Sequence, residues 1–261
     1  MSISVHNSAS EQVVTPEMID ALGYEKLTFV APDGFMLPYR RLVTHPELPG
    51  RFSLMIFFHG VGSVGADNFL QMRIPGRHFA DYAERHRLKT VLLFPQCHPG
   101  SQWVDVPWDA PAHNLPERPS THMAAAMELL RAALEEFSPD PAAVYAGGLS
   151  MGGYGAWDIV SRMPETFSAI LAICGGADVK QAPRLRNLRV YACHGARDAT
   201  VPPSRSRDMI SALRAAGNDR IMYRELPDAA HNAWDAVFAD DVALDFIFRP
   251  ACDFMDNKKE E

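Results

Sequence analysis

Features that mark several classes of protein are absent from this sequence of 261 residues. No apolar run approaches the ~20 residues that a helix needs to span a bilayer. The opening stretch, MSISVHNSASEQVV, lacks the basic segment and the following apolar run of a secretory signal. We therefore expect a cytoplasmic protein that does not associate with membranes.

Cysteine and positive charge are also scarce. The four cysteines are scattered without C-x-x-C spacing, and Cys174 and Cys193 lie in apolar, strand-like runs, so we interpret them as buried side chains. The formal charge of −7 argues against a nucleic-acid partner, because phosphate binding requires a concentrated basic face. His98, His113 and His122 have acidic neighbours, but their spacing does not place several on one helical face, so we expect neither a metal nor a cofactor.

The length and composition of the chain favour one domain. Apolar and charged residues stay mixed from about residue 27 to residue 248, and the hydrophobic share of 47% is ordinary for a globular protein with a substantial core. We predict a single α/β domain over residues 23–250. An N-terminal extension over residues 1–22 would precede it, and a charged C-terminal tail over residues 251–261 would follow it.

Short apolar runs alternate with helical patterns, which is typical of a mainly parallel, doubly wound sheet with helices on both faces. The first two runs flank the turn triplet Pro32-Asp33-Gly34 and should form an antiparallel hairpin at a sheet edge. Six further runs are almost continuously apolar or β-branched, as strands covered on both faces should be. The runs of this sheet of about eight strands cover residues 26–30, 35–43, 52–58, 90–94, 143–146, 168–173, 188–193 and 221–226.

Capping residues and proline mark two of the helices. Ser120 or Thr121 should cap a helix over residues 121–137, with Pro139 beyond its end. A second helical pattern follows Pro203 and should stop at Gly217.

Two connections have informative lengths. About 25 proline-rich residues, including Trp103 and Trp108, separate the strand that ends near Phe94 from the helix that follows. A loop of that length in a compact domain is usually functional. The segment over residues 175–187 is, in contrast, too short to hold an inserted helical lid, so we expect an open site.

Ser150 is the candidate nucleophile, because the run Gly148-Leu149-Ser150-Met151-Gly152 matches G-x-S-x-G. A strand pattern precedes this run and a helical pattern follows it, which is the strand–turn–helix setting of a nucleophile elbow. Glycines two positions before and after the serine would permit the sharp turn that lifts Oγ clear of the sheet. The alternative is a glycine-rich turn with an incidental serine.

A serine hydroxyl requires a general base, and the base requires an anionic partner that fixes its tautomer. In enzymes with such an elbow, the order along the chain is serine, then an acid, then histidine. His231 is the histidine that follows Ser150 beyond His194, and it lies in a loop before a helix, so we predict His231 as the base. We interpret His194, which precedes Gly195 at a strand end, as a structural histidine.

Asp198 is the predicted acid, because it comes just after the strand run at residues 188–193. Functional groups in open α/β sheets collect at the carboxyl ends of the strands. Asp178 follows the preceding strand and is the rival. Asp228 lies three residues from His231, a spacing at which a carboxylate rarely points at Nδ1.

The main-chain N–H groups of Met151 and Val61 are the predicted oxyanion donors. Met151 would begin the helix after the nucleophile, where the helix dipole also favours negative charge. Val61 lies in the glycine-rich segment HGVGSVGADN, which follows a strand run and can turn its amides inward. His59 should brace this segment. The alternative for the segment is a plain glycine turn.

Four tryptophans divide into two groups. Trp103, Trp108 and Trp234 lie in the long loop or close to the predicted base, and they are candidate walls of a substrate pocket. Simple packing is the alternative for each of them. Trp157, in the helix after the elbow, should belong to the core.

Six segments of the chain together resemble a known family. In chain order they are HGVGSVGADN, PQC, GLSMGGYGAWD, ICGG, HGARDATVP and PDAAHNAWD. They are similar to bacterial α/β hydrolases described as predicted peptidases or esterases, which are relatives of phospholipase/carboxylesterase and polyhydroxybutyrate-depolymerase-like enzymes. The resemblance extends over about residues 27–248. It implies the α/β-hydrolase fold, a triad of Ser150, Asp198 and His231, and hydrolysis of carboxylic esters.

We therefore predict a serine carboxylesterase that hydrolyses short-chain esters of a small-molecule substrate. A serine peptidase or an acyltransferase using the same three residues is the alternative within enzymes. A catalytically silent binding protein on the same scaffold is the alternative outside them. The sequence leaves open whether the chain forms a homo-oligomer.

Overall fold

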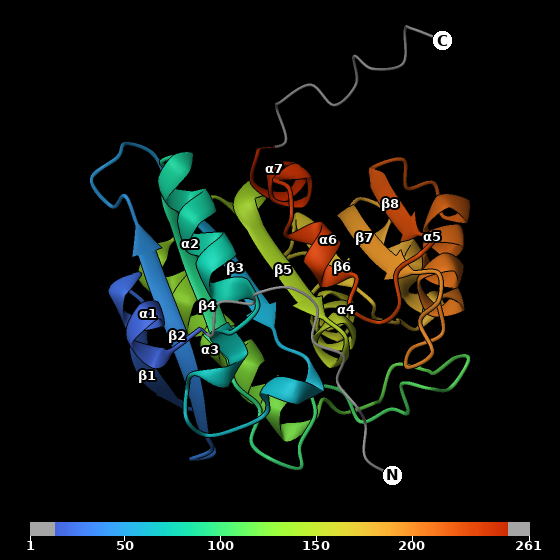
Figure 1. The fold of residues 1–261 in the computed structure, drawn as a ribbon, viewed down its shortest axis with the longest axis horizontal. Coiled ribbons are helices and arrows are strands. Elements are labelled where there is room, and N and C mark those ends of the chain that lie inside the picture. Colours follow the sequence, from blue (N-terminus) through green and yellow to red (C-terminus); the bar gives the residue numbers. More distant parts are fainter. Residues whose placement is uncertain (1–13, 250–261) are drawn as a thin grey trace, which may run out of the picture.

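An eight-stranded sheet forms the centre of the computed structural model, which describes residues 14–249 (Figure 1). The strands are, in chain order, β1 (Glu25–Val30), β2 (Met36–Thr44), β3 (Ser53–Phe58), β4 (Thr90–Pro95), β5 (Val144–Leu149), β6 (Ala169–Ile173), β7 (Arg189–Gly195) and β8 (Ile221–Leu226). They are arranged in the order β1-β2-β4-β3-β5-β6-β7-β8, and all neighbours from β4 to β8 pair in parallel. The predicted mainly parallel α/β fold is confirmed.

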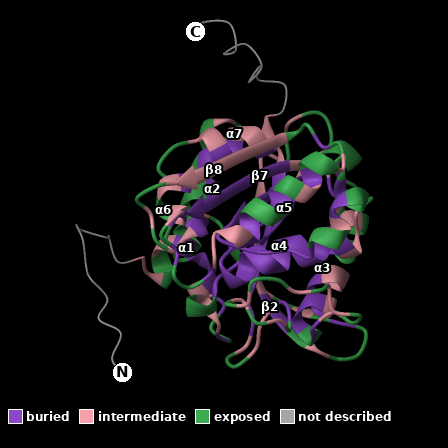
Figure 2. Ribbon diagram, turned by 90° about the vertical axis from the view of Figure 1, so that its right-hand side faces the viewer, coloured by how far each residue is buried: buried purple, intermediate pink, exposed green. Residues whose placement is uncertain are grey.

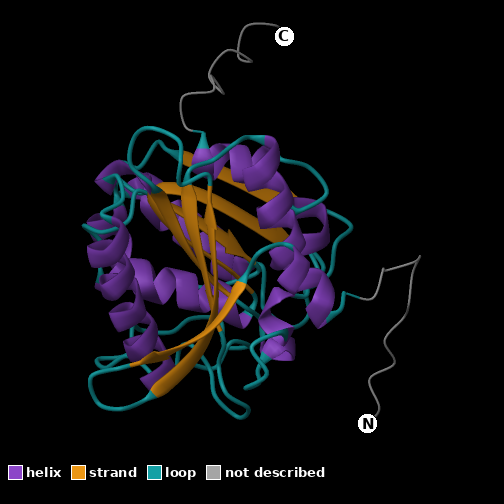
Figure 3. Cartoon of the chain, turned by 90° about the vertical axis from the view of Figure 1, so that its left-hand side faces the viewer, coloured by secondary structure: helices purple, strands orange, loops and turns teal. Residues whose placement is uncertain are grey.

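The N-terminal hairpin turns at the predicted triplet. Asp33 Oδ1 accepts a hydrogen bond from Phe35 N at 3.0 Å, and Gly34 adopts a φ of +87° that favours glycine. Val30 and Met36 are the last paired residues before the turn, and β2 pairs antiparallel with β4. The hairpin therefore forms the edge of the twisted sheet (Figure 3).

Strand β5, which leads to the candidate nucleophile, is longer than the sequence pattern indicated. It continues through Gly147 and Gly148 beyond the predicted end at residue 146. A Cβ atom added at Gly147 would lie 2.5 Å from Met55 Cε on β3, so close packing between the strands favours glycine here. Glycine generally weakens strands, which is why the sequence pattern ended the strand early.

Helices cover both faces of the sheet (Figures 1 and 2). The helices are α1 (Pro16–Ala21), α2 (Pro75–Arg85), α3 (Thr121–Phe137), α4 (Met151–Arg162), α5 (Ser204–Ala215), α6 (Trp234–Val237) and α7 (Val242–Phe248), with short 3-10 helices at Val61–Ser63, Leu70–Met72, Pro141–Ala143 and Val179–Leu185. One core lies between the sheet and helices α3, α4 and α5, and includes Met123 and Leu213. A second core lies under α1, α2 and α7, and includes Phe79 and Leu244.

The predicted helix boundaries agree with the structure. The Ser120 hydroxyl accepts a hydrogen bond from Met123 N at 3.1 Å and so caps α3. Helix α5 starts directly after Pro203, and Gly217 follows its end with a φ of +87°. Both helices therefore begin and end where their capping residues indicated.

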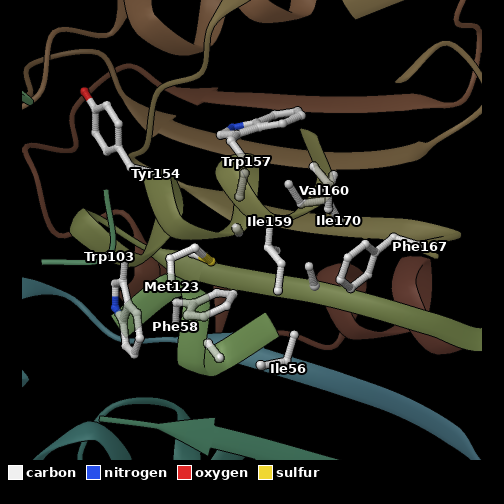
Figure 4. Close-up of a cluster of buried hydrophobic side chains, with 14 of the residues drawn as sticks. Ile56, Phe58, Trp103, Met123, Tyr154, Trp157, Ile159, Val160, Phe167 and Ile170 are labelled. Atoms are coloured by element: carbon white, nitrogen blue, oxygen red, sulfur yellow. The ribbon is translucent and has the colours of Figure 1, made fainter. Parts of the chain in front are cut away.

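Trp157 is buried with 2% of its surface exposed, so its predicted place in the core is confirmed (Figure 4). Helix α1 falls within the predicted extension and buries Ile19 completely against the sheet. Residues 1–13 and 250–261, which include the predicted tail, lie outside the described residues. Within residues 14–249, none of the helices combines the length and the apolar character that crossing a membrane requires.

Candidate active site

Ser150 lies at the sharp turn between β5 and α4. Its φ of 55° and ψ of −123° are strained for a residue with a side chain, and its N–H donates to Ile173 O at 2.8 Å. A Cβ atom added at Gly148 would lie 2.0 Å from Gly152 O, and one added at Gly152 would lie 2.0 Å from Phe58 O. The backbone around the turn therefore packs too closely for any residue but glycine at these two positions.

The structure brings the three predicted triad residues together. Ser150 Oγ lies 2.7 Å from His231 Nε2, and His231 Nδ1 lies 2.7 Å from Asp198 Oδ2. The His231 side chain is 22% exposed, whereas the Asp198 side chain is fully buried. The His231 loop reaches this position because it crosses the end of β7 closely: a Cβ atom at Gly195 would lie 1.9 Å from Ala230 O.

The two rival carboxylates are engaged elsewhere. Asp178 caps the 3-10 helix at Val179–Leu185 and accepts a hydrogen bond from Leu115 N at 3.0 Å. Asp228 pairs with Arg197 at 2.6 Å on the surface. Of the three acids that the sequence offered, Asp198 alone contacts the imidazole of His231.

Four donors surround the Asp198 carboxylate. Thr200 N and Val201 N donate to Oδ1 at 2.8 and 2.9 Å, while His231 and His194 lie beside Oδ2 at 2.7 and 3.2 Å. Burial raises the pKa of Asp198, but the hydrogen bonds from His194, His231 and the two amides outweigh it and hold the pKa well below its usual range. The carboxylate therefore stays ionised, as the partner of an imidazole base must be.

The segment at residues 59–65, here called the oxyanion loop, packs against the nucleophile. A Cβ atom added at Gly60 would lie 3.4 Å from Ser150 Cβ. Val61 follows Gly60 and is exposed. Met151 is the first residue of α4, so the N–H of Met151 has no acceptor within the helix. Both predicted oxyanion donors thus belong to segments that adjoin Ser150.

His59 supports the oxyanion loop through two hydrogen bonds. Its Nε2 accepts a hydrogen bond from Cys97 N at 2.9 Å, so Nδ1 carries the proton and donates to Gly60 O at 2.7 Å. Burial lowers the pKa of His59 to about 4, which keeps the ring neutral near pH 7. These contacts support the predicted bracing role.

Comparisons with known proteins identify the fold family. No protein-family model and no curated protein sequence matches the chain. Among solved structures, a thermostable esterase is 30% identical with a TM-score of 0.77, over 86% of this chain and 62% of that protein. The chain therefore has the α/β-hydrolase fold, and it spans only 62% of the length of that esterase.

Two further neighbours show the same fold at lower identity. A ferulic acid esterase is 15% identical with a TM-score of 0.64, over 87% of this chain and 98% of that protein. The Pyrococcus horikoshii acylaminoacyl peptidase is 12% identical with a TM-score of 0.59, over 82% of this chain and 38% of that protein. The fold therefore occurs in neighbours described both as esterases and as peptidases.

Trp108 lines a surface cleft of about 610 Å³ beside the oxyanion loop of this α/β hydrolase. Val61 and Phe35 add apolar surface to the cleft, and Gln102 and Asp105 add polar groups. Trp108 is half-buried, so part of its indole faces the cleft. Its predicted place near a substrate is compatible with this position.

Trp103 does not line the cleft. Its side chain is fully buried between β3 and α4 (Figure 4). Its Nε1 donates a hydrogen bond to His59 O at 3.1 Å. The indole packs so closely on α4 that a Cβ atom added at Gly155 would lie 2.9 Å from Trp103 Cβ. The prediction that Trp103 contacts a substrate is therefore wrong. Trp234 packs edge-on against the His231 ring, with centroids 5.3 Å apart, and so supports the orientation of the imidazole.

Helices α4 and α5 hold the long loop at residues 96–120 by its main chain. Three of their side chains donate to carbonyl oxygens of the loop: Tyr154 to Trp108 O at 2.8 Å, Arg162 to Pro116 O at 2.9 Å and Arg205 to Pro111 O at 3.1 Å. Arg205 is only 3% exposed, although an arginine in the first turn of a helix gives no sequence signal of burial. Sequence reasoning missed these three contacts.

One set of three possible metal ligands occurs among residues 14–249. The donor atoms of Cys174, His194 and Asp198 lie within 4.8 Å of one another. Burial raises the pKa of the Cys174 thiol to about 12, which disfavours the thiolate that metals bind. His194 and Asp198 are already engaged with each other, so the donor set does not favour a cation.

Proposed function

We propose that this α/β hydrolase is a serine carboxylesterase that cleaves short-chain esters of small molecules through an acyl-enzyme on Ser150. The observation that carries the proposal is the continuous path of hydrogen bonds from Ser150 Oγ through His231 to Asp198, with 2.7 Å at both steps. A serine with a strained backbone, a partly exposed imidazole and a buried, ionised carboxylate are the groups that acyl transfer requires.

The reaction would proceed in two steps. Ser150 Oγ attacks the ester carbonyl carbon while His231 Nε2 takes the hydroxyl proton, and the Met151 and Val61 N–H groups receive the developing oxyanion. His231 then returns the proton to the departing alcohol, which leaves an acyl-serine ester. A water molecule, deprotonated by the same imidazole, attacks that ester and releases the carboxylic acid and the free serine.

The preference for short acyl chains rests on the connection between β6 and β7. That connection forms only the 3-10 helix at Val179–Leu185, whose Asp178 cap anchors it beside the long loop. This connection holds no longer helix that could serve as a lid, so a long acyl chain would gain little apolar burial there. Esters of short acids should therefore be the better substrates.

The decisive experiment compares the wild-type chain with Ser150→Ala, using p-nitrophenyl acetate and a fluorophosphonate label. We expect the variant to lose both hydrolysis and labelling while its thermal unfolding stays nearly unchanged. Ser161→Ala provides a matched control, because Ser161 is a buried serine on the same helix whose hydroxyl bonds only to Trp157 O at 2.7 Å among the contacts described. Activity that survives Ser150→Ala would refute the proposal.

Product analysis separates the alternatives on the same site. Acyl esters that accumulate in the presence of a competing alcohol would indicate an acyltransferase. Cleavage of an acyl-peptide faster than of p-nitrophenyl esters would indicate a peptidase. Best activity on acyl chains longer than about ten carbons would contradict the expected preference for short chains.

A further inference from the structure

His194, at the end of β7, contacts the same carboxylate oxygen as the candidate base. Its Nε2 lies 3.2 Å from Asp198 Oδ2, which His231 Nδ1 approaches at 2.7 Å. The side chain of His194 is completely buried. Two imidazoles therefore share one oxygen of the predicted acid.

The surroundings of His194 define where its proton lies. Nε2 faces two groups that can only accept, Asp198 Oδ2 and Val201 O at 3.1 Å, so Nε2 carries the proton. Nδ1 lies 2.7 Å from Ser206 Oγ, whose hydroxyl can donate to it. With its proton on Nε2, the neutral ring hydrogen-bonds Val201 O, and the same N–H lies beside Asp198 Oδ2 at 3.2 Å.

We propose that His194 is a positioning residue of the hydrolytic centre, whose Nε2–H holds the Asp198 carboxylate in the orientation and charge state that His231 requires. The inference rests on the proposed function, since it assigns His194 a part in the same proton path. It differs from a purely structural role because it ties His194 to the turnover of the enzyme.

The need for such a donor follows from the burial of Asp198. A buried carboxylate is costly unless hydrogen bonds compensate its charge. Within residues 14–249, both ion-pair partners of Asp198 are imidazoles, and neither an arginine nor a lysine is among them. Without His194, Oδ2 would depend on His231 alone, so the carboxylate would become more basic and less fixed.

Other titratable groups around His194 do not supply this donor. Cys174 lies just after β6 with its sulfur within 4.8 Å, and burial raises the pKa of that thiol to about 12, so it stays uncharged and is only a weak S–H donor. Glu225 pairs with His194 in register on β8, but its carboxylate binds Arg207 at 2.6 Å. The charge that responds to His194 is therefore that of Asp198.

The test uses two substitutions at His194. His194→Leu removes the donor, and His194→Gln keeps an N–H group near the position of Nε2. We expect the leucine variant to lose about 10²-fold in kcat, with KM little changed, because the base is misplaced rather than the substrate. Its acid limb of kcat/KM should move to higher pH, since a more basic Asp198 stabilises the protonated base. The glutamine variant should recover most of the kcat and the wild-type profile.

A second readout does not depend on activity. The low-field proton resonance of His231 Nδ1–H reports its short hydrogen bond to Asp198, and it should broaden or disappear in His194→Leu, where the carboxylate is less fixed, but persist in His194→Gln. Tyr191→Phe is the matched control, because it removes another buried polar group of β7, a hydroxyl 3.1 Å from Arg224. This control should leave the pH profile and the resonance unchanged.

The outcomes distinguish this inference from the proposed function. Equal losses in the leucine and glutamine variants, or a leucine variant with wild-type kcat, pH profile and resonance, would overturn the role of His194 alone. A wild-type chain that neither hydrolyses esters nor reacts with a fluorophosphonate would overturn the proposed function. In that case the resonance would still report whether His194 positions Asp198.

Discussion

The triad and the long loop at residues 96–120 are built in opposite ways. Ser150 and Asp198 follow directly from the ends of β5 and β7, and their polar atoms are buried and hydrogen-bonded on several sides. The long loop has no helix or strand of its own, and the side chains of α4 and α5 hold it at a few points. The sheet thus positions Ser150 and Asp198, whereas helices α4 and α5 hold the loop that forms the wall of the cleft.

This contrast has a kinetic consequence. Changes at the strand ends should act on kcat, because they alter groups that act in the transition state. Changes in the long loop should act mainly on KM if the cleft beside it receives the substrate, as the proposed function requires. The first three of the following predictions test that division, and the last concerns stability.

The largest effect is expected for Asp198→Asn. An amide can present its N–H to His231 Nδ1 and thereby stabilise the wrong tautomer, so kcat should fall by about 10⁴-fold. Steady-state kinetics with p-nitrophenyl acetate would measure the loss. Asp178→Asn is the control, because Asp178 caps a 3-10 helix away from the imidazole, and it should retain kcat within a few-fold. Equal losses in the two variants would contradict the assignment of the acid.

A smaller effect is expected in the oxyanion loop. A methyl group at Gly60 would lie 2.9 Å from Leu149 Cδ1 and 3.4 Å from Ser150 Cβ, so Gly60→Ala should displace the loop from the nucleophile. We expect a loss in kcat of about 10- to 100-fold, since a single oxyanion donor contributes on the order of 10²-fold. A Cβ atom at Gly62 meets no atom within 4 Å, so Gly62→Ala should change kcat little.

The two loop tryptophans provide the next comparison. Trp108→Ala should raise KM by about tenfold, since it removes apolar contact area from the cleft, and should leave kcat and thermal unfolding nearly unchanged. Trp103→Ala should instead lower the unfolding temperature, because Trp103 is completely buried. A large loss of kcat without a change in KM for Trp108→Ala would contradict the expectation that the long loop acts on KM and the strand ends act on kcat.

The last prediction concerns stability in acid. Burial lowers the pKa of His59, His113 and His122 each to about 4, with Arg205 also acting on His113 and His98 on His122. In the unfolded chain an imidazole has a pKa of about 6.5, so the folded protein binds fewer protons between these values. The free energy of unfolding should be highest above about pH 6.5 and fall as the pH drops toward about 4.

Urea unfolding at about pH 7 and about pH 4.5 would measure this loss. His122→Gln removes one of these imidazoles and should reduce the loss. An unchanged loss in the variant would show that His122 is not protonated on unfolding. A smaller loss of unfolding free energy in the variant would show that His122, where the long loop meets α3, contributes to the acid sensitivity.

The strands were predictable because buried parallel strands are nearly continuous in apolar residues. The prediction ended β5 too early, since Gly147 and Gly148 carry no strand signal and are required by packing against β3. Helices α6 and α7 span four and seven residues, too few for a helical period to be recognised. The register of the sheet became visible only in the structure.

The three triad residues were predictable from chain order and from their positions after strand runs. The contact between His194 and Asp198 was not, because it depends on how the chain turns after β7. The burial of Trp103 was equally invisible, since an irregular loop has no period that separates inward from outward side chains. The sequence thus identified reactive residue types, while their supporting contacts required coordinates.

The long loop is fastened through its carbonyl oxygens, and this has a consequence for how the protein can diverge. Tyr154, Arg162 and Arg205 recognise a main-chain group that every amino acid possesses. Mutations at the exposed positions of the loop can therefore replace side chains while the three attachments persist, whereas buried Trp103 has to stay. On the proposed function, selection, natural or in the laboratory, can change what the cleft accepts without rebuilding the triad, which makes these exposed positions the preferred place to randomise for new specificity.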